Sequence, residues 1–260
     1  MNRNPLKRVG TGSTTIHLDE MAKQYSQARD HFIQLILPRF ERRNADQRKF
    51  YLVKSIIKYL RETGPQQDPI LRGWTSAFDR LWKSSFYMID VSPPQLTATE
   101  LAPRITLFLI LVYLNCPEEI VRFRDGAIDD RALPFTKEIL ENAVSAHHSY
   151  SRLRGDIERD LFIRAFLREQ NPWCAIQLTM GMEKIHNGSR IFPFYATDLH
   201  EKSSLRVSPH NATIWLVDIP EDFVDENLKK AIPHARRKVP WKGPAFDKQT
   251  SQDDPTEDVR

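Results

Sequence analysis

The sequence predicts a mainly α fold, in which a helical bundle is followed by a small C-terminal α+β extension containing a hairpin. Apolar residues recur at steps of three and four between residues 15 and 170, which is the spacing of one face of a helix. The β-rich stretch ATIWLVDI at 212–219 follows and indicates a strand. Nine glycines against 17 prolines disfavour a doubly wound nucleotide-binding fold, which needs glycine-rich turns.

We therefore expect four segments along the chain. Residues 1–14 form a disordered N-terminus, and residues 15–170 form the bundle domain. The strand-containing extension covers residues 171–232. Residues 233–260 form a disordered tail, first basic and then acidic, because no apolar pattern continues beyond Pro233.

Three amphipathic helices are predicted in the first part of the bundle, at 21–40, 46–62 and 69–89. Pro38 should kink the first helix or end it near Leu37. The residues expected to face inward from the first helix are Met21, Tyr25, Ala28, Phe32, Leu35, Ile36 and Phe40. Those expected to face inward from the other two are Phe50, Val53, Ile57, Leu60, Ile70, Trp74, Phe78, Leu81, Trp82 and Phe86.

Further helices are predicted between residues 97 and 170. One begins at Thr97 or Thr99, either of which can cap it, and carries LFLILVYL at 107–114. This stretch is apolar on every side, which predicts a central position. A short helix starts at Pro117, and two more run from Thr136 to about residue 148 and from Asp156 to about residue 169. The inward residues expected in the last helix are Ile157, Leu161, Phe162, Ala165 and Phe166.

The extension combines strand and helix patterns. Residues 174–180 fit either a strand or a last helical turn, and periodicity does not decide between them. The strand at 212–219 has Leu205 and Val207 as its expected partner strand across Pro209. Residues 221–232 are predicted to be helical.

Composition excludes several classes of protein. Charged residues make up 28% of the 260 and hydrophobic residues 40%, which is typical of a folded globular chain. The two cysteines, Cys116 and Cys174, are too few for a disulfide framework or a cysteine-rich metal site. The eight histidines include no His-x-x-x-His spacing. We therefore predict neither a metal nor a cofactor.

The longest apolar run is too short to cross a membrane. Eight residues rise only about 12 Å as a helix, against a bilayer core of about 30 Å. Residues 1–10 are polar and basic, without the apolar stretch of a secretory signal. We expect no membrane span and a cytoplasmic or nuclear location.

Two basic segments form a candidate site for nucleic acid or another anionic surface. Eight basic residues between 39 and 61 are opposed only by Glu41 and Asp46, and segment 228–243 contains six basic residues and no acid. Such a stripe can contact phosphates in a salt-dependent way, although a solvated helix face has the same composition. The candidate binding residues are Arg42, Arg43, Lys49, Lys54, Lys58, Arg61, Arg236, Arg237 and Lys238.

Cysteine chemistry is a second alternative. Cys174 lies in the same region of the sequence as His186, His200 and His210, and a thiolate with an imidazole is the minimum for a cysteine nucleophile. The apolar context Trp173-Cys174-Ala175-Ile176 also fits a small core residue. No catalytic residue is assigned.

Several short motifs in order resemble a known family. They are Asp129-Asp130 before Leu133-Pro134-Phe135, then Phe162, Phe166 and Gln170 before Trp173-Cys174-Ala175, then Ile191-Phe192-Pro193-Phe194, and finally Trp215-Leu216-Val217-Asp218-Ile219. This pattern resembles the helical N-terminal region of filamentous-fungal protein-kinase-domain proteins. The catalytic motifs are lacking: residues 200–207 contain no glycine, and neither His-Arg-Asp nor Asp-Phe-Gly occurs. The resemblance therefore implies a regulatory or interaction module and no kinase residues.

We expect a non-catalytic protein-interaction or regulatory module, a remnant of or accessory to a kinase-domain protein. Its partner would be a protein, such as a kinase domain or a second copy of the chain. Binding of nucleic acid or an anionic surface is the first alternative, and an enzyme that uses Cys174 with a nearby histidine is the second.

Overall fold

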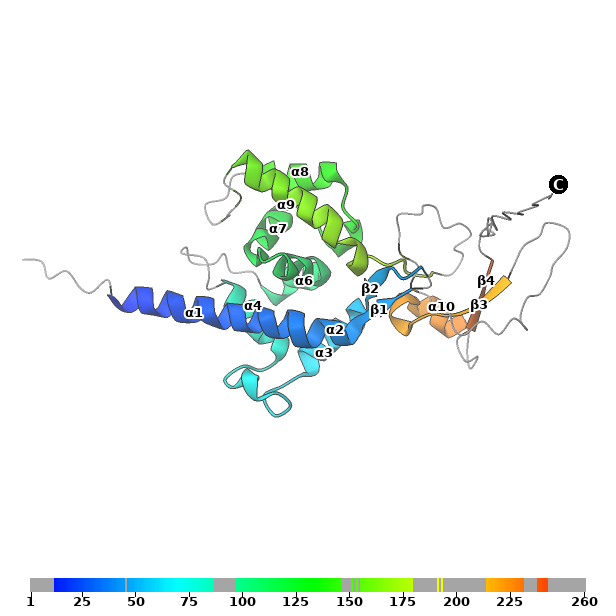
Figure 1. The fold of residues 1–260 in the computed structure, drawn as a ribbon, viewed down its shortest axis with the longest axis horizontal. Coiled ribbons are helices and arrows are strands. Elements are labelled where there is room, and N and C mark those ends of the chain that lie inside the picture. The colour runs from blue at the N-terminus through cyan, green and yellow to red at the C-terminus, as the bar shows by residue number, and fades with distance from the viewer. Residues whose placement is uncertain are drawn as a thin grey trace, which may run out of the picture.

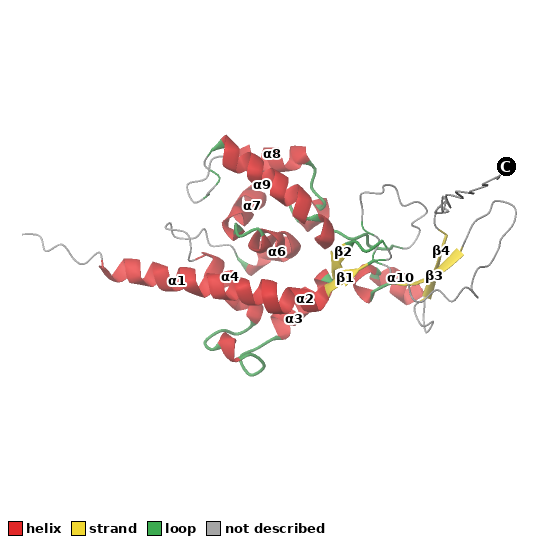
Figure 2. Cartoon of the chain, in the orientation of Figure 1, coloured by secondary structure: helices red, strands yellow, loops and turns green. Residues whose placement is uncertain are grey.

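The computed structural model describes residues 12–44, 46–86, 97–145, 151, 153, 155–179, 191, 193, 214–231 and 238–242. These residues form a mostly helical body with two small antiparallel sheets (Figures 1 and 2). A long helix, α1, runs along one side of the body, and the helices of residues 105–169 stack over it (Figure 1). The last strands and α10 lie at the opposite end from the start of α1. The predicted mainly α fold with a small strand-containing part is confirmed.

The first helix continues through Pro38 and does not end there. α1 spans Gly12–His31, a π-helical turn η1 spans Phe32–Ile36, and α2 spans Leu37–Phe40. In the π turn the backbone N–H of Leu37 donates to the carbonyl of Phe32, five residues back, which shifts the register just before the proline. Because of this shift, one residue that faces inward differs from the predicted one. Leu35 is 51% exposed, while Leu37 is buried in its place.

A β-hairpin replaces the first turn of the second predicted helix. β1 (Glu41–Arg43) pairs with β2 (Lys49–Tyr51), and α3 begins only afterwards, spanning Val53–Glu62. The side-chain oxygen of Asn44 accepts hydrogen bonds from the backbone N–H groups of Asp46 and Arg48. An asparagine used in this way stabilises a turn. The predicted helix start at residue 46 is therefore wrong, and Phe50 reaches the core from a strand.

The third predicted helix is split in two. A 3₁₀ turn, η2, spans Pro69–Leu71, and α4 spans Ala77–Phe86. Gly73 lies between them with φ of +83°, a conformation that interrupts a helix. Leu71 is fully buried and Ile70 is 48% exposed, which reverses the expectation for Ile70. The end of the predicted helix, at 87–89, lies outside the described residues.

The apolar helix lies at the centre of the bundle, as predicted. Thr97 caps α5 (Ala98–Leu101) through a reciprocal capping box with Glu100. η3 (Ala102–Arg104) then leads into α6 (Ile105–Tyr113), in which seven residues are buried. The turn η4 and helix α7 contact α6, and helix α4 contacts η4.

The second part of the bundle is built around stacked phenylalanines. Its elements are η4 (Pro117–Glu119), α7 (Ile120–Asp125), η5 (Asp130–Ala132), α8 (Lys137–Ser145), α9 (Asp156–Glu169) and η6 (Asn171–Trp173). Phe123, Phe135 and Phe166 stack with ring centroids 5.5–6.1 Å apart. The buried amide of Gln170 donates to the carbonyl of Phe135 and accepts from its N–H group. The residues that suggested a family resemblance here therefore have a packing role.

Two inward assignments on α9 are wrong. Ile157 is 75% exposed and Leu161 is 60% exposed, whereas Phe162, Ile163 and Phe166 are buried. The buried stripe is thus rotated relative to the expected one, because Ile163 replaces Leu161 on the inward side. α9 begins at Asp156, and Gly155 occupies its N-cap position.

The extension pairs its strands differently from the prediction. β3 (Ile214–Asp218) pairs antiparallel with β4 (Lys238–Lys242), and η8 (Glu221–Phe223) and α10 (Glu226–Ala231) lie between them. The segment expected to be disordered beyond Pro233 thus contains a strand. The expected partner strand at Leu205 and Val207 lies outside the described residues. A small apolar cluster of Phe50, Ile191 and Phe223 joins the extension to β2.

A buried ion pair fastens the connection between α8 and α9. Glu119 and Arg122 have side chains 0% and 1% exposed, and their charged groups lie 2.5 Å apart. Arg122 also donates to the carbonyl of Val144, and Ser151 donates to Glu119 over 2.6 Å. Pro117-Glu118-Glu119 does start a helix as predicted, but Glu119 faces the interior because it neutralises this arginine.

Replacing Glu119 with glutamine should reduce the free energy of unfolding by about 3–5 kcal/mol, because a buried arginine would lose its counter-ion. The exposed pair Lys137–Glu141 provides the control, and Glu141→Gln should change stability by less than about 0.5 kcal/mol. Urea unfolding measures both. Equal effects of the two substitutions would contradict the role of the buried pair.

His31 connects α1 to the loop before η2. Its Nε2 lies 3.1 Å from Asp68, and both side chains are largely buried. Burial lowers the pKa of His31 below its ordinary value of 6.5, and although Asp68 opposes this change, Arg80 and Arg39 reinforce it. The folded protein therefore binds a proton at His31 less readily than the unfolded chain does.

The contribution of His31 to the free energy of unfolding should therefore be fully present above pH 6.5. It should be lost as the pH drops from 6.5 towards the lower pKa of the folded state. His31→Gln should remove that part of the pH dependence. The measurement is urea unfolding at several pH values between 7.5 and 5, compared between the two proteins. Parallel curves for both would contradict the lowered pKa of His31.

Candidate functional site

Three of the predicted cations form an exposed basic face on α3. Lys54, Lys58 and Arg61 follow one another at helical spacings of four and three, so their side chains lie on one side of the helix. All three are exposed. Within the described part of the chain none of them forms an ion pair, and Arg61 lies over the ring of Phe78 at 5.9 Å. We call these three residues the basic face.

The other cations of the first segment are occupied by local contacts. Arg42 donates to the backbone carbonyls of Arg39 and Glu41, and Arg43 donates to the carbonyl of Gln47. Lys49 lies in β2, 3.7 Å from Glu41 and over the ring of Tyr51. The predicted continuous stripe is therefore broken, because the hairpin separates these residues from the helix.

The cations of the second basic segment are only partly described. Arg236 and Arg237 lie outside the described residues, and Lys238 is the first residue of β4. Nearer to the basic face, Lys229 of α10 pairs with Glu226 over 2.7 Å. That contact lowers the pKa of Glu226, with smaller contributions from Lys54 and Lys230. The start of α10 therefore lies within electrostatic reach of the start of α3.

A cleft of about 410 Å³ lies beside the basic face, between the bundle and the extension. Its apolar walls come from α3, from the segment after η5, from the segment after η6 and from η8. The apolar residues that line the cleft include Val53, Ile57, Leu133, Pro134, Ile176 and Phe223. Lys54 stands at the junction, because it belongs to both the basic face and the cleft. The volume is in the range of ligand sites.

Asp222 forms one side of the cleft and holds the extension against α3. Its carboxylate accepts hydrogen bonds from the backbone N–H of Ser55 over 2.8 Å and from the Ser55 hydroxyl over 2.7 Å. Ser55 is in the first turn of α3, where backbone N–H groups lack helical partners. An acid supplied 167 residues along the chain thus acts as the helix cap.

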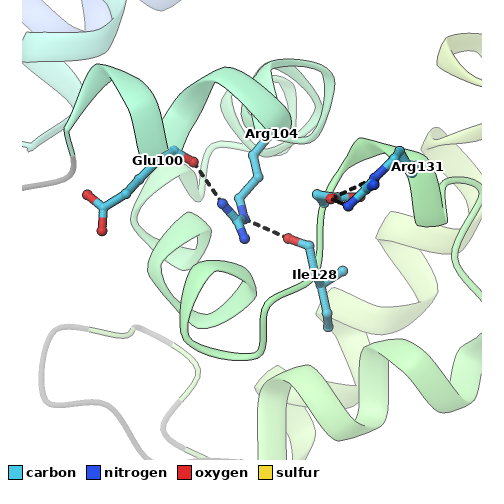
Figure 3. Close-up of polar contacts among 5 residues, drawn as sticks. Glu100, Arg104, Ile128 and Arg131 are labelled. Carbon is cyan, nitrogen blue, oxygen red and sulfur yellow. Dashed lines mark hydrogen bonds and ion pairs between the residues drawn. The ribbon is translucent and has the colours of Figure 1, made fainter.

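Asp130 plays the same part for α6 on another side of the cleft. Its two carboxylate oxygens accept the backbone N–H groups of Thr106 and Leu107 over 2.8 and 2.9 Å. Burial raises the pKa of Asp130, and these two hydrogen bonds act against the rise. Figure 3 shows how the preceding loop is held: Arg104 bridges the carbonyls of Glu100 and Ile128. Arg131 lies outside this bridge and pairs with Asp129 over 2.6 Å.

The cleft is therefore better suited to binding than to proton transfer. Each of its two carboxylates is held by two donors, and Arg131 has Asp129 as its counter-ion. Lys54 remains as the charged lining residue without an ion pair in the described part of the chain. Cys174 lines the cleft and is half-buried. His186, His200 and His210 lie outside the described residues, so the enzyme alternative stays a prediction.

Sequence reasoning missed the two capping acids. Asp129 forms a local turn, in which its side chain accepts a hydrogen bond from the backbone N–H of Arg131. The link from Asp130 to α6 has no local sequence signal. The link from Asp222 to α3 has only an indirect one, because Leu52 at the N-cap of α3 provides no side-chain acceptor.

Asp222→Ala should lower stability by about 0.5–2 kcal/mol, the usual effect of losing a helix cap. Ser55→Ala should add little to it in the double variant, because both substitutions remove one interaction. Urea unfolding measures the coupling. Asp225→Ala is the matched control, since Asp225 caps α10 at Leu228 and, within the described part of the chain, forms no hydrogen bond with α3. Additive effects of Asp222→Ala and Ser55→Ala would contradict the capping interaction between these two residues.

No group of three metal-ligating side chains occurs among the described residues, and no helix among them is long and apolar enough to cross a membrane. No family model, curated protein or solved structure matches the chain.

Proposed function

We propose that this chain is a non-catalytic interaction module that binds an acidic protein partner. The observation that supports the proposal is the basic face, in which Lys54, Lys58 and Arg61 are exposed and form no ion pair within the described part of the chain. Cations arranged in this way attract an anionic partner and orient it before contact. The apolar cleft beside Lys54 offers a protein partner side-chain contacts in addition to charge.

Nucleic acid is the second candidate, and the same cations support it. Two features favour the protein. Proteins that bind single-stranded nucleic acid use exposed aromatic rings. Within residues 22–44, 46–85, 97–145 and 155–179, the exposed large apolar side chains are Leu35, Ile70, Ile157 and Leu161, none of them aromatic. The apolar part of the cleft lining, such as Val53, Ile57 and Leu133, also offers contacts to apolar side chains, which a protein has and a phosphate backbone lacks. The relationship to kinase-domain proteins, self-association and the cytoplasmic or nuclear location stay predictions.

The triple variant Lys54→Gln, Lys58→Gln, Arg61→Gln should bind fluorescein-labelled poly-glutamate roughly tenfold more weakly, because three exposed charge contacts would be lost. The measurement is fluorescence anisotropy at 50 and 200 mM salt. The control triple is Lys83→Gln, Lys137→Gln, Arg164→Gln, which removes the same charge from cations already paired with acids one turn away.

An equal loss of affinity in both triple variants would contradict the proposal, because net charge alone would then explain binding. Duplex DNA measured in parallel separates the two partner classes. Binding of DNA that is tighter than binding of poly-glutamate at 200 mM salt would favour the nucleic-acid candidate.

A further inference from the structure

The backbone of residues 175–177 borders the cleft, next to the single β-bridge at Leu178. The backbone N–H of Ile176 donates to Ile191, and the N–H of Leu178 donates to Phe223. Leu178 also accepts from Asp225, which completes a parallel bridge to Val224. Because successive residues of an extended chain direct their N–H and C=O groups to opposite edges, those of Ala175 and Gln177 point away from these partners.

The groups on that second edge are unpaired. Within the described part of the chain, neither the N–H nor the C=O of Ala175 and Gln177 forms a hydrogen bond. Both residues line the cleft together with Ile176. An unpaired edge of this kind is a template for another extended chain, and peptides that add a strand gain affinity from backbone bonds and specificity from pockets for alternate side chains.

We propose that the 175–177 edge receives an extended peptide of alternating apolar and acidic residues from the partner protein. Alternate side chains of an added strand point to opposite faces, so one set can enter the apolar cleft lined by Val53, Ile57 and Leu133. The other set meets solvent and the basic face. This inference rests on the proposed function and adds the conformation and pattern of the bound segment.

Charge complementarity selects acidic residues for the second set. Asp130 and Asp222 each accept two hydrogen bonds that hold α6 and α3, so their positions are fixed by this chain. Lys54 lines the cleft without an ion pair in the described part of the chain. An incoming carboxylate can thus pair with Lys54.

The first test compares two labelled peptides on the full chain, an alternating (Val-Glu)₄ octapeptide and octa-glutamate, both with blocked ends. The alternating peptide carries half the charge but can both pair with the edge and bury its valines. We expect it to bind at least about tenfold more tightly at 200 mM salt, from backbone hydrogen bonds and apolar burial together.

The second test removes one donor from the edge. Gln177 is exposed and its N–H has no hydrogen bond within the described residues, so Gln177→Pro deletes that donor and blocks the edge without breaking any of the described bonds. We expect affinity for the alternating peptide to fall about tenfold and affinity for octa-glutamate to stay constant. Gln177→Ala, which keeps the N–H, is the control and should bind as the natural protein does. If circular dichroism shows that Gln177→Pro unfolds, an alternating peptide N-methylated at every second residue tests the same pairing on the natural protein.

The outcomes separate this inference from the function on which it rests. Equal binding of the two peptides, or no effect of the proline and of N-methylation, overturns strand addition and leaves the acidic partner in place. Binding of neither peptide to the natural protein overturns both.

Discussion

The structure depends on a helix whose apolar side chains must be shielded from water on every side. α6 buries seven of its nine residues, and such a helix is stable only when other elements surround it. The need to cover α6 explains why α4 and the η4–α7 segment lie close to it. The interior position also creates a difficulty at its N-terminus, because the first backbone N–H groups of a covered helix need an acceptor from elsewhere. Asp130 supplies that acceptor, and its position determines where the following Leu133-Pro134 segment lies.

The same solution is used a second time at α3, with larger consequences. Leu52 provides no cap, so the acceptor is Asp222, which belongs to the extension. One side chain therefore couples two parts of the chain that have separate apolar clusters. The cleft lies where these two anchored segments meet. Because both acids are used in holding the structure together, the chemistry left at the cleft is that of Lys54, an apolar wall and the backbone of residues 175–177, where Ala175 and Gln177 form no backbone hydrogen bond with the described residues.

Much of the helical body follows from local patterns, and what does not follow has identifiable causes. The central helix, the Thr97 cap and the strand at 214–218 agree with expectation because each is set by residues near to it in sequence. The hairpin at 41–51 was missed because Asn44 organises its turn through a single side-chain oxygen, within a stretch whose apolar spacing also fits a helix. Leu35 was misplaced by a π turn, and Ile157 and Leu161 by a rotation of α9, neither of which changes the hydrophobic pattern.

The candidate site was predictable only in part, for the same reason. Charge spacing along residues 54–61 predicts one exposed basic surface, since a helix places such residues on one side, and whether this surface binds a partner stays a prediction. Arg42 and Lys49 were grouped with it because the sequence hides the hairpin that removes them. The cleft itself depends on contacts between residues more than a hundred positions apart, and no local pattern records such contacts.

Hydrogen–deuterium exchange on the full chain, with and without the alternating peptide, tests most directly whether the cleft and its edge are the binding surface. We expect slower exchange at the amides of Ala175 and Gln177 and in the first turn of α3, with α8 and α9 unchanged. Protection confined to α9, around the exposed Ile157 and Leu161, would place the interaction surface elsewhere and contradict this interpretation of the structure.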